Sequence, residues 1–196
     1  MAETVDQFRC RGIGMDGWHH SRQTLSSFED PEEAFRRRGA HFTFDAPAYY
    51  QFIQSLRSPT HADQAIPFPT FSHSLKDPSP SEQPIEPSDD LVLIEGLYVL
   101  LDISPWSEAA ALLDAKIWIE ADHTLTRERL IRRHIETGVE QTASAAQNRV
   151  DGSDMLNAQF IQDRLIKTDV TVVHVKSEGF DGEGVERNVC FQLDAS

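Results

Sequence analysis

Three short apolar runs separated by helical patterns constrain the fold of this chain more than any other feature. They are LVLI at residues 91–94, KIWIE at 116–120 and VTVVHV at 170–175. Runs of this length and composition are typical of strands buried on both faces, and strands that alternate with helices usually pair in parallel. The pattern therefore predicts an α/β fold with a mostly parallel sheet flanked by helices.

The segments between these runs carry helix start and stop signals. An acid before a helix accepts bonds from the free N–H groups of its first turn, and a glycine after it adopts the left-handed conformation that ends many helices. These signals stand at Asp30 and Gly39, at Asp45, and at Asp122 and Gly138. A further helix is expected over about residues 142–165 with a break near Gly152, and a weak edge strand over 187–193.

Prolines are concentrated in one part of the chain. Seven of the ten lie between Pro59 and Pro87. Because proline lacks an N–H group and fixes φ, this part cannot form a long helix or a central strand. We expect an extended loop over about residues 58–90, within a single domain that covers residues 1–196.

Composition excludes several classes of protein. The net charge of −14 argues against general binding to nucleic acid or to anionic membranes. No apolar run approaches the roughly 20 residues that a membrane span needs, and the N-terminal sequence is not a signal peptide. Cys10 and Cys190 match no metal-site spacing. We therefore expect a soluble, cytoplasmic protein.

Two acids follow predicted strands. Asp16 lies in GIGMDGWHH, after a short strand remnant, and Glu95 ends the run at 91–94. Ligands of α/β proteins bind at the carboxyl ends of parallel strands. Two acids there suit phosphoryl transfer, in which one carboxylate deprotonates a hydroxyl and the other supports Mg²⁺. The alternative is that each acid is merely solvated at a turn, and the residues alone leave both interpretations open.

Seven of the 18 basic side chains fall in two short clusters. These are Arg36, Arg37 and Arg38, and then Arg127, Arg129, Arg132 and Arg133. Such clusters can form an anion pocket in an acidic protein, or they can be solvated helix faces with ion pairs at helical spacing, such as those from Arg36 and Arg37 to Glu32 and Glu33. Both interpretations stay open at this point.

Several motifs occur together in one order along the chain. They are MDGWH, RRRGA followed by TFD, FSHSLKDP, LIEGLYVLLD followed by PW, RLIRRHIETG, and a later Asn157–Ala158 pair. In this order they resemble the uridine kinase and phosphoribulokinase-like branch of P-loop kinases, and most closely its fungal ATP-dependent kinase-like members. The resemblance covers about residues 14–175. It implies transfer of a phosphoryl group from ATP to a hydroxyl of a small molecule.

The resemblance also implies roles for individual residues. Asp16 would activate the acceptor hydroxyl with His19 close by, and Arg38 and His73 would lie near the acceptor. Glu95 would end the strand whose acid assists Mg²⁺. The remaining positions, Arg129, Arg132 and Arg133, match a helical lid over about residues 123–150 that closes over the ATP phosphates.

One part of the family pattern is missing from this sequence. No GxxxxGK[ST] loop, which would wrap the phosphates in backbone N–H groups, precedes Asp16. We therefore expect an N-terminally truncated kinase fold whose neighbouring strands have an unpaired edge and an uncovered apolar face. Four outcomes stay open: a homo-oligomer covers them, an N- or C-terminal segment of the chain covers them, the chain folds poorly, or the true start of the protein lies upstream.

Three functions remain open. The first is an ATP-dependent kinase acting on a nucleoside, sugar or pantothenate-like alcohol. The second is a catalytically inactive homologue, a pseudoenzyme, that binds a small molecule or serves as an accessory protein in a metabolic pathway. The third is an interaction protein that uses the Pro-rich loop. Trp18 and Ser72 depart from the residues common in the family and leave the acceptor open.

Overall fold

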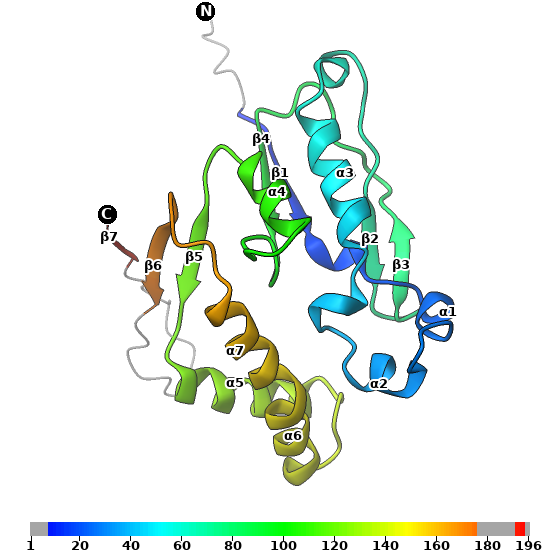
Figure 1. Cartoon of the computed structure of the whole chain (residues 1–196), viewed down its shortest axis with the longest axis vertical. Helices are drawn as coiled ribbons and strands as arrows, with labels where there is room; N and C mark the ends of the chain where they lie inside the picture. Colours follow the sequence, from blue (N-terminus) through cyan, green and yellow to red (C-terminus); the bar gives the residue numbers. More distant parts are fainter. Residues whose placement is uncertain (1–7, 176–190, 195–196) are drawn as a thin grey trace, which may run out of the picture. The chain divides into compact units, whose positions relative to one another are not determined.

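The computed structural model describes residues 8–175 and 191–194 and divides the chain into two compact units, Met1–Leu112 and Leu113–Ser196 (Figure 1). Parallel strand pairs flanked by helices occur in both units, which confirms the predicted α/β class. That residues 1–196 form one domain stays a prediction.

The first unit is organised around one parallel pair of strands. Strand β1 (Cys10–Gly14) pairs in parallel with β4 (Leu91–Glu95), with Gly14 opposite Glu95. Acids that precede β4 hold the start of β1, since Asp90 Oδ2 accepts a bond from the Arg9 backbone N–H at 2.8 Å and Asp89 Oδ2 one from Arg11 Nε at 3.2 Å. The carboxyl ends of both strands therefore lie at one edge.

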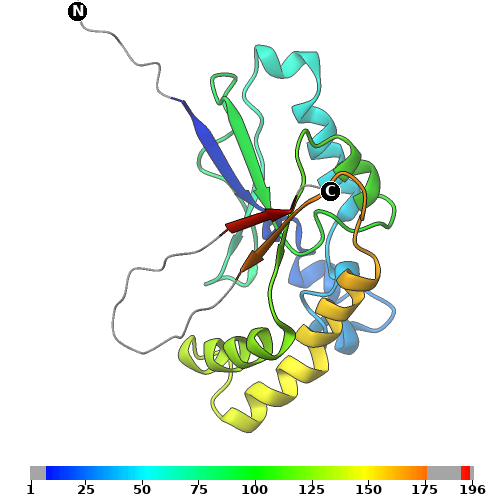
Figure 2. The same ribbon diagram turned by 90° about the vertical axis from the view of Figure 1, so that its left-hand side faces the viewer.

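Two helices lie on one side of this pair: α3 (Ala46–Leu56) and α4 (Trp106–Ala111), as Figures 1 and 2 show. Aromatic rings fill the core here. Tyr49 packs between Trp18 at 5.3 Å and Trp106 at 5.2 Å, measured between ring centroids. All three residues are buried, which confirms that the two tryptophans serve packing.

The opposite side of β4 is apolar and open. Leu91 and Leu93 are 45% and 54% exposed. Among the described strands, β4 pairs with β1 alone, so its other edge has no partner in residues 8–175 and 191–194. The unpaired edge and the uncovered apolar face are therefore as predicted.

The other elements of the first unit are short. They are η1 (Met15–Trp18), α1 (Arg22–Leu25), α2 (Pro31–Arg36), η2 (His41–Thr43), η3 (Pro59–Ala62), β2 (Pro69–Ser72) and β3 (Asp77–Pro80). The predicted caps are confirmed at Asp30 and Asp45, whose side chains accept bonds from backbone N–H groups of α2 and α3. Gly39 has the expected positive φ of 104°.

The expectation of an extended loop over residues 58–90 is wrong in part. Strands β2 and β3 pair as an antiparallel hairpin. A two-stranded ribbon has only edge strands, where proline is tolerated because one side of each strand needs no N–H donor. Lys76 turns the hairpin with a φ of 58°.

Two glycines let η1 approach its neighbours closely. A Cβ atom on Gly17 would lie 2.0 Å from the backbone oxygen of Pro69, at the start of β2. A Cβ atom on Gly96 would lie 2.3 Å from Met15 Cβ. Because neither glycine has a side chain, η1 packs closely against both the hairpin and the end of β4.

In the second unit β6 (Thr171–Val175) pairs in parallel with β5 (Ile117–Glu120) and antiparallel with β7 (Phe191–Asp194) (Figure 2). The predicted edge strand is thus confirmed at its C-terminal part, while residues 187–190 lie outside the described residues. The helices are α5 (His123–Glu136), α6 (Ala143–Arg149), the π-helix η4 (Val150–Asp154) and α7 (Met155–Asp163).

The predicted helix break near Gly152 is wrong: α6, η4 and α7 follow one another without a gap, and the irregularity at Gly152 is the π-helix η4. Two side-chain pairs join it to α5: Arg127 Nε to Asp151 Oδ1 at 2.7 Å, and His134 Nε2 to Asp154 Oδ2 at 2.6 Å. None of the described helices is long and apolar enough to cross a membrane.

We expect Gly17→Ala to lower the free energy of unfolding by about 1–3 kcal/mol, the usual cost of forcing extra volume into a packed site. The added methyl group would meet backbone atoms of Pro69, which cannot move aside as a side chain can. Urea denaturation measures the change. Gly12→Ala is the matched control, since nothing lies within 4 Å of its Cβ position, and equal losses in the two variants would contradict the prediction.

Candidate functional site

Asp16 and Glu95 meet at the carboxyl ends of β1 and β4. Asp16 lies in η1, two residues after β1 ends, and Glu95 is the last residue of β4. The Cβ position of Gly14 is 2.9 Å from Glu95 Oε1, so a side chain at Gly14 would collide with this carboxylate. Burial, and then the negative charge of Asp16, raise the pKa of the Glu95 carboxyl above its ordinary value. The structure therefore brings the two predicted acids into electrostatic contact.

This carboxylate pair fits one kind of cation. Among the described residues no group of three or more His, Cys, Asp and Glu side chains could hold a metal ion. Mg²⁺, however, is commonly bound by one or two carboxylates together with substrate phosphates and water. Burial is the main cause of the raised pKa of Glu95, and the negative charge of Asp16 adds to it, so a nearby cation would favour the ionised carboxylate. Glu95 could thus hold Mg²⁺, beside Asp16, when phosphate oxygens complete its coordination.

His19 lies beside Asp16 between two phenylalanine rings. Its Nδ1 is 2.9 Å from the backbone oxygen of Asp16, and its ring centroid is 3.9 Å from that of Phe44 and 4.9 Å from that of Phe71. Burial lowers the pKa of His19 below its ordinary value. The imidazole therefore takes up a proton less readily than an ordinary histidine does.

Phe71, in β2, also contacts the other two residues predicted for the acceptor side. The guanidinium carbon of Arg38 is 5.4 Å from the centre of its ring, and the His73 ring centroid is 5.4 Å away. Arg38 Nη2 donates to Asp77 Oδ1 at 3.2 Å and to the His20 backbone oxygen at 3.1 Å. His19, Arg38 and His73 thus gather around one ring.

The two arginine clusters differ in what the structure shows of their side chains. Arg36 makes two 2.6 Å bonds to Glu33 on the surface of α2, which favours the solvated-face interpretation for that residue. Arg129, Arg132 and Arg133 lie exposed on α5, in the second unit, with Arg132 Nε 3.8 Å from Glu136 Oε1. Closure of these three arginines over nucleotide phosphates stays a prediction.

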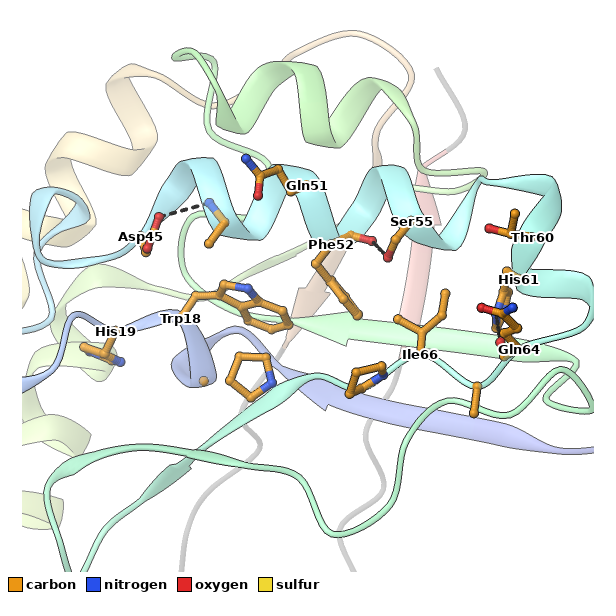
Figure 3. A pocket seen from close by; sticks show the side chains of 15 residues that line it. Trp18, His19, Asp45, Gln51, Phe52, Ser55, Thr60, His61, Gln64 and Ile66 are labelled. Atoms are coloured by element: carbon orange, nitrogen blue, oxygen red, sulfur yellow. Dashed lines mark hydrogen bonds between the residues drawn. The ribbon is translucent and has the colours of Figure 1, made fainter.

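A cavity of about 640 Å³ opens next to η1, under α3 (Figure 3). It is lined by Gly17, Trp18, His19, Asp45, Ala48, Gln51, Phe52, Ser55, Thr60, His61, Gln64, Ala65, Ile66, Pro67 and Pro69. Asp16 directly precedes the lining residue Gly17 in η1 but is not itself a lining residue. The size is within the range of small-molecule sites.

Most lining residues carried no functional signal in the sequence. Asp45 was recognisable only as a helix cap, and its Oδ1 does accept a bond from the Ala48 N–H at 3.0 Å. His61 and Gln64 lie in the Pro-rich stretch, where no periodic pattern places a side chain on a given face. Phe71 was visible only as part of the FSHSLKDP motif.

Known proteins resemble this chain over most of its length. An ATP-dependent kinase-like protein of Aspergillus versicolor, notR′, is 40% identical over 148 residues, which cover 75% of this chain and 86% of that protein. The ATP-dependent kinase YFH7 of Saccharomyces cerevisiae is 32% identical over 198 residues, covering 85% of this chain and 55% of its own length.

Structure comparison agrees. The crystal structure of YFH7, whose fold is that of P-loop kinases with a circular permutation, matches with a TM-score of 0.76 at 28% identity, over 86% of this chain and 59% of YFH7. This chain therefore spans little more than half of the yeast protein. The sequence model of the phosphoribulokinase and uridine kinase family matches residues 5–179, and the chain belongs to that family.

Proposed function

We propose that this chain acts in the transfer of a phosphoryl group from ATP to a hydroxyl of a small molecule. One observation carries the proposal: the register of β1 and β4 brings Asp16 and Glu95 together at one sheet edge, close enough for the charge of Asp16 to raise the pKa of Glu95. The names of the similar fungal proteins support the same reaction class.

The residues divide the chemistry between them. The carboxylate of Asp16 accepts the proton of the acceptor hydroxyl as its oxygen attacks the γ-phosphorus, the bond from that phosphorus to the bridging oxygen breaks, and ADP leaves. Glu95 would support a bound Mg²⁺, whose charge would offset that of the phosphates. The Nδ1 contact of His19 with the Asp16 backbone oxygen stabilises η1, which carries the base.

The nucleotide-binding side of the proposed site has less support than the acceptor side. The sequence contains no GxxxxGK[ST] loop. Arg129, Arg132 and Arg133 would supply positive charge to the phosphates, since all three are exposed on α5.

A second candidate function is binding of a small molecule without catalysis. The cavity favours it, because all its lining residues belong to the first unit and none comes from a nucleotide-binding loop. Such a protein would bind its ligand whether or not MgATP is present.

Calorimetric titration with MgATP separates the two functions. If the chain is a kinase, we expect binding heat that weakens in Glu95→Gln, because the variant loses a carboxylate that supports the cation. Asp16→Asn should keep MgATP binding but lower kcat for phosphoryl transfer by about 10²- to 10⁴-fold, the usual contribution of a general base. No binding heat with the unmodified chain would exclude the kinase and leave the binding protein.

The carboxylate pair also predicts a pH dependence of stability. The pKa of Glu95 in the folded protein is raised above its ordinary 4.5, so the folded state favours the protonated carboxyl. The contribution of Glu95 to the free energy of unfolding is therefore fully present below pH 4.5 and is lost as the pH rises through the pKa of the folded state. We expect Glu95→Gln to melt at a higher temperature than the unmodified chain at pH 7–8, and the gain to disappear near pH 4.

Two controls accompany these melting curves. Glu82→Gln, at an exposed position of the Pro-rich segment, should show no gain that depends on pH. In an Asp16→Asn background the gain from Glu95→Gln should shrink, because the repulsion is already removed. An undiminished gain would mean that the two carboxylates do not interact.

A further inference from the structure

The cavity is elongated along α3 and has two different ends. Figure 3 shows His19 and Asp45 at one end and Thr60, His61 and Gln64 at the other. The first end adjoins η1, where Asp16 stands. A ligand that places a hydroxyl near Asp16 would therefore extend its remaining atoms toward His61.

The middle of the cavity is apolar. Trp18 and Phe52 lie with ring centroids 4.7 Å apart at a 45° angle, and Ile66 lines the same stretch (Figure 3). A flat or ring-shaped body gains contact area against such a wall without needing hydrogen bonds. The wall favours a ligand with an apolar or ring face.

Among the described residues, the polar side chains around this wall include one carboxylate, that of Asp45, and no Lys or Arg, and several are held by local bonds. Ser55 Oγ donates to the Phe52 backbone oxygen at 2.7 Å, which leaves the hydroxyl oxygen as an acceptor. His61 Nδ1 lies 3.3 Å from the Gln64 backbone oxygen. A hydroxyl and an imidazole held in this way suit ligand hydroxyls.

Positive charge is missing from the lining. Within residues 8–175 and 191–194, no Lys or Arg lines the cavity, while the Asp45 carboxylate does. Arg38 lies outside the lining, and its charge is paired with Asp77. Proteins bind phosphate and carboxylate groups through Arg, Lys or helix N-termini, and a buried anion without such a partner is costly.

We propose that the cavity binds an uncharged, hydroxyl-bearing molecule of nucleoside or disaccharide size with an apolar or ring face, and that it rejects ligands carrying a phosphate or carboxylate. That this molecule is the phosphate acceptor rests on the proposed function. The charge selectivity rests on the cavity alone and holds equally for a binding protein.

Binding measured in the absence of nucleotide tests this selectivity. The probes are pairs that differ in one anionic group: uridine and uridine 5′-monophosphate, glucose and glucose 6-phosphate, pantothenol and pantothenate. We expect at least one neutral member to bind and its anionic partner to bind at least about tenfold more weakly, as one uncompensated charge would cause. The indole N–H signal of Trp18 in NMR spectra, assigned with Trp18→Phe, reports whether the probe is in the cavity.

Matched lysine variants test whether the absence of Lys and Arg from the lining causes the charge selectivity. Gln64→Lys adds a positive charge to the lining and should raise the affinity for the anionic member relative to the neutral one by about tenfold or more. Gln54→Lys adds the same charge at an exposed position of α3 outside the lining and should leave the ratio unchanged. Gln51→Lys provides a second lining position if Gln64→Lys folds poorly.

Several outcomes would overturn the proposal. They are anionic members that bind as tightly as neutral ones, an unchanged ratio in both lining variants, or no binding of any neutral member at millimolar concentration. These binding measurements contain no ATP, so they do not depend on phosphoryl transfer. A failure of the proposed kinase activity, tested with Asp16→Asn, is therefore distinguishable from a failure of the charge selectivity. Charge selectivity without any MgATP binding would support the cavity assignment and reject the kinase.

Discussion

The in-register parallel pairing of β1 with β4 is the constraint on which the first unit depends. It sets Gly14 opposite Glu95, and the missing side chain at Gly14 leaves room for the Glu95 carboxylate. A shift by one residue would move every side chain of β4 to the other face and carry Glu95 away from Asp16. The bonds from Arg9 and Arg11 to Asp90 and Asp89 oppose such a shift at the other end of the strands.

The same pairing imposes an electrostatic cost. Burial makes ionisation of Glu95 costly, and the negative charge of Asp16 at the same sheet edge adds to that cost. Sites of this kind reduce the stability of a protein alone and recover it when a cation binds. The repulsion between Asp16 and Glu95 is thus a physical reason to connect this edge with magnesium and phosphate, independent of sequence similarity.

The hairpin of β2 and β3 brings together the residues predicted for the acceptor side of the site. Phe71 contacts His19, Arg38 and His73, and Pro69 receives the close approach of Gly17. The Pro-rich segment is therefore more than a connection between two helical regions. It supplies one wall of the cavity and the ring around which the acceptor-side residues gather.

Local physical chemistry made much of the fold predictable. The caps at Asp30, Asp45 and Asp122 follow from hydrogen bonding within a few residues, and all are observed. At Gly152 the helix is irregular rather than broken, because the chain continues through the π-helix η4. The hairpin in the Pro-rich segment was not predictable, because strand pairing depends on a partner and proline content argues against it. The positions of Phe71 and His61 were not predictable either, because they depend on how parts of the chain that are distant in the sequence pack together.

The sequence by itself determined the α/β class, the helix boundaries and the two acids at strand ends, since each depends on neighbouring residues. Only the tertiary structure decided that Asp16 and Glu95 share one edge, because register joins residues about 80 positions apart. It alone also decided that a cavity without lysine or arginine adjoins them. A pocket is made by side chains from separate elements, and no local pattern records which of them will face the same space.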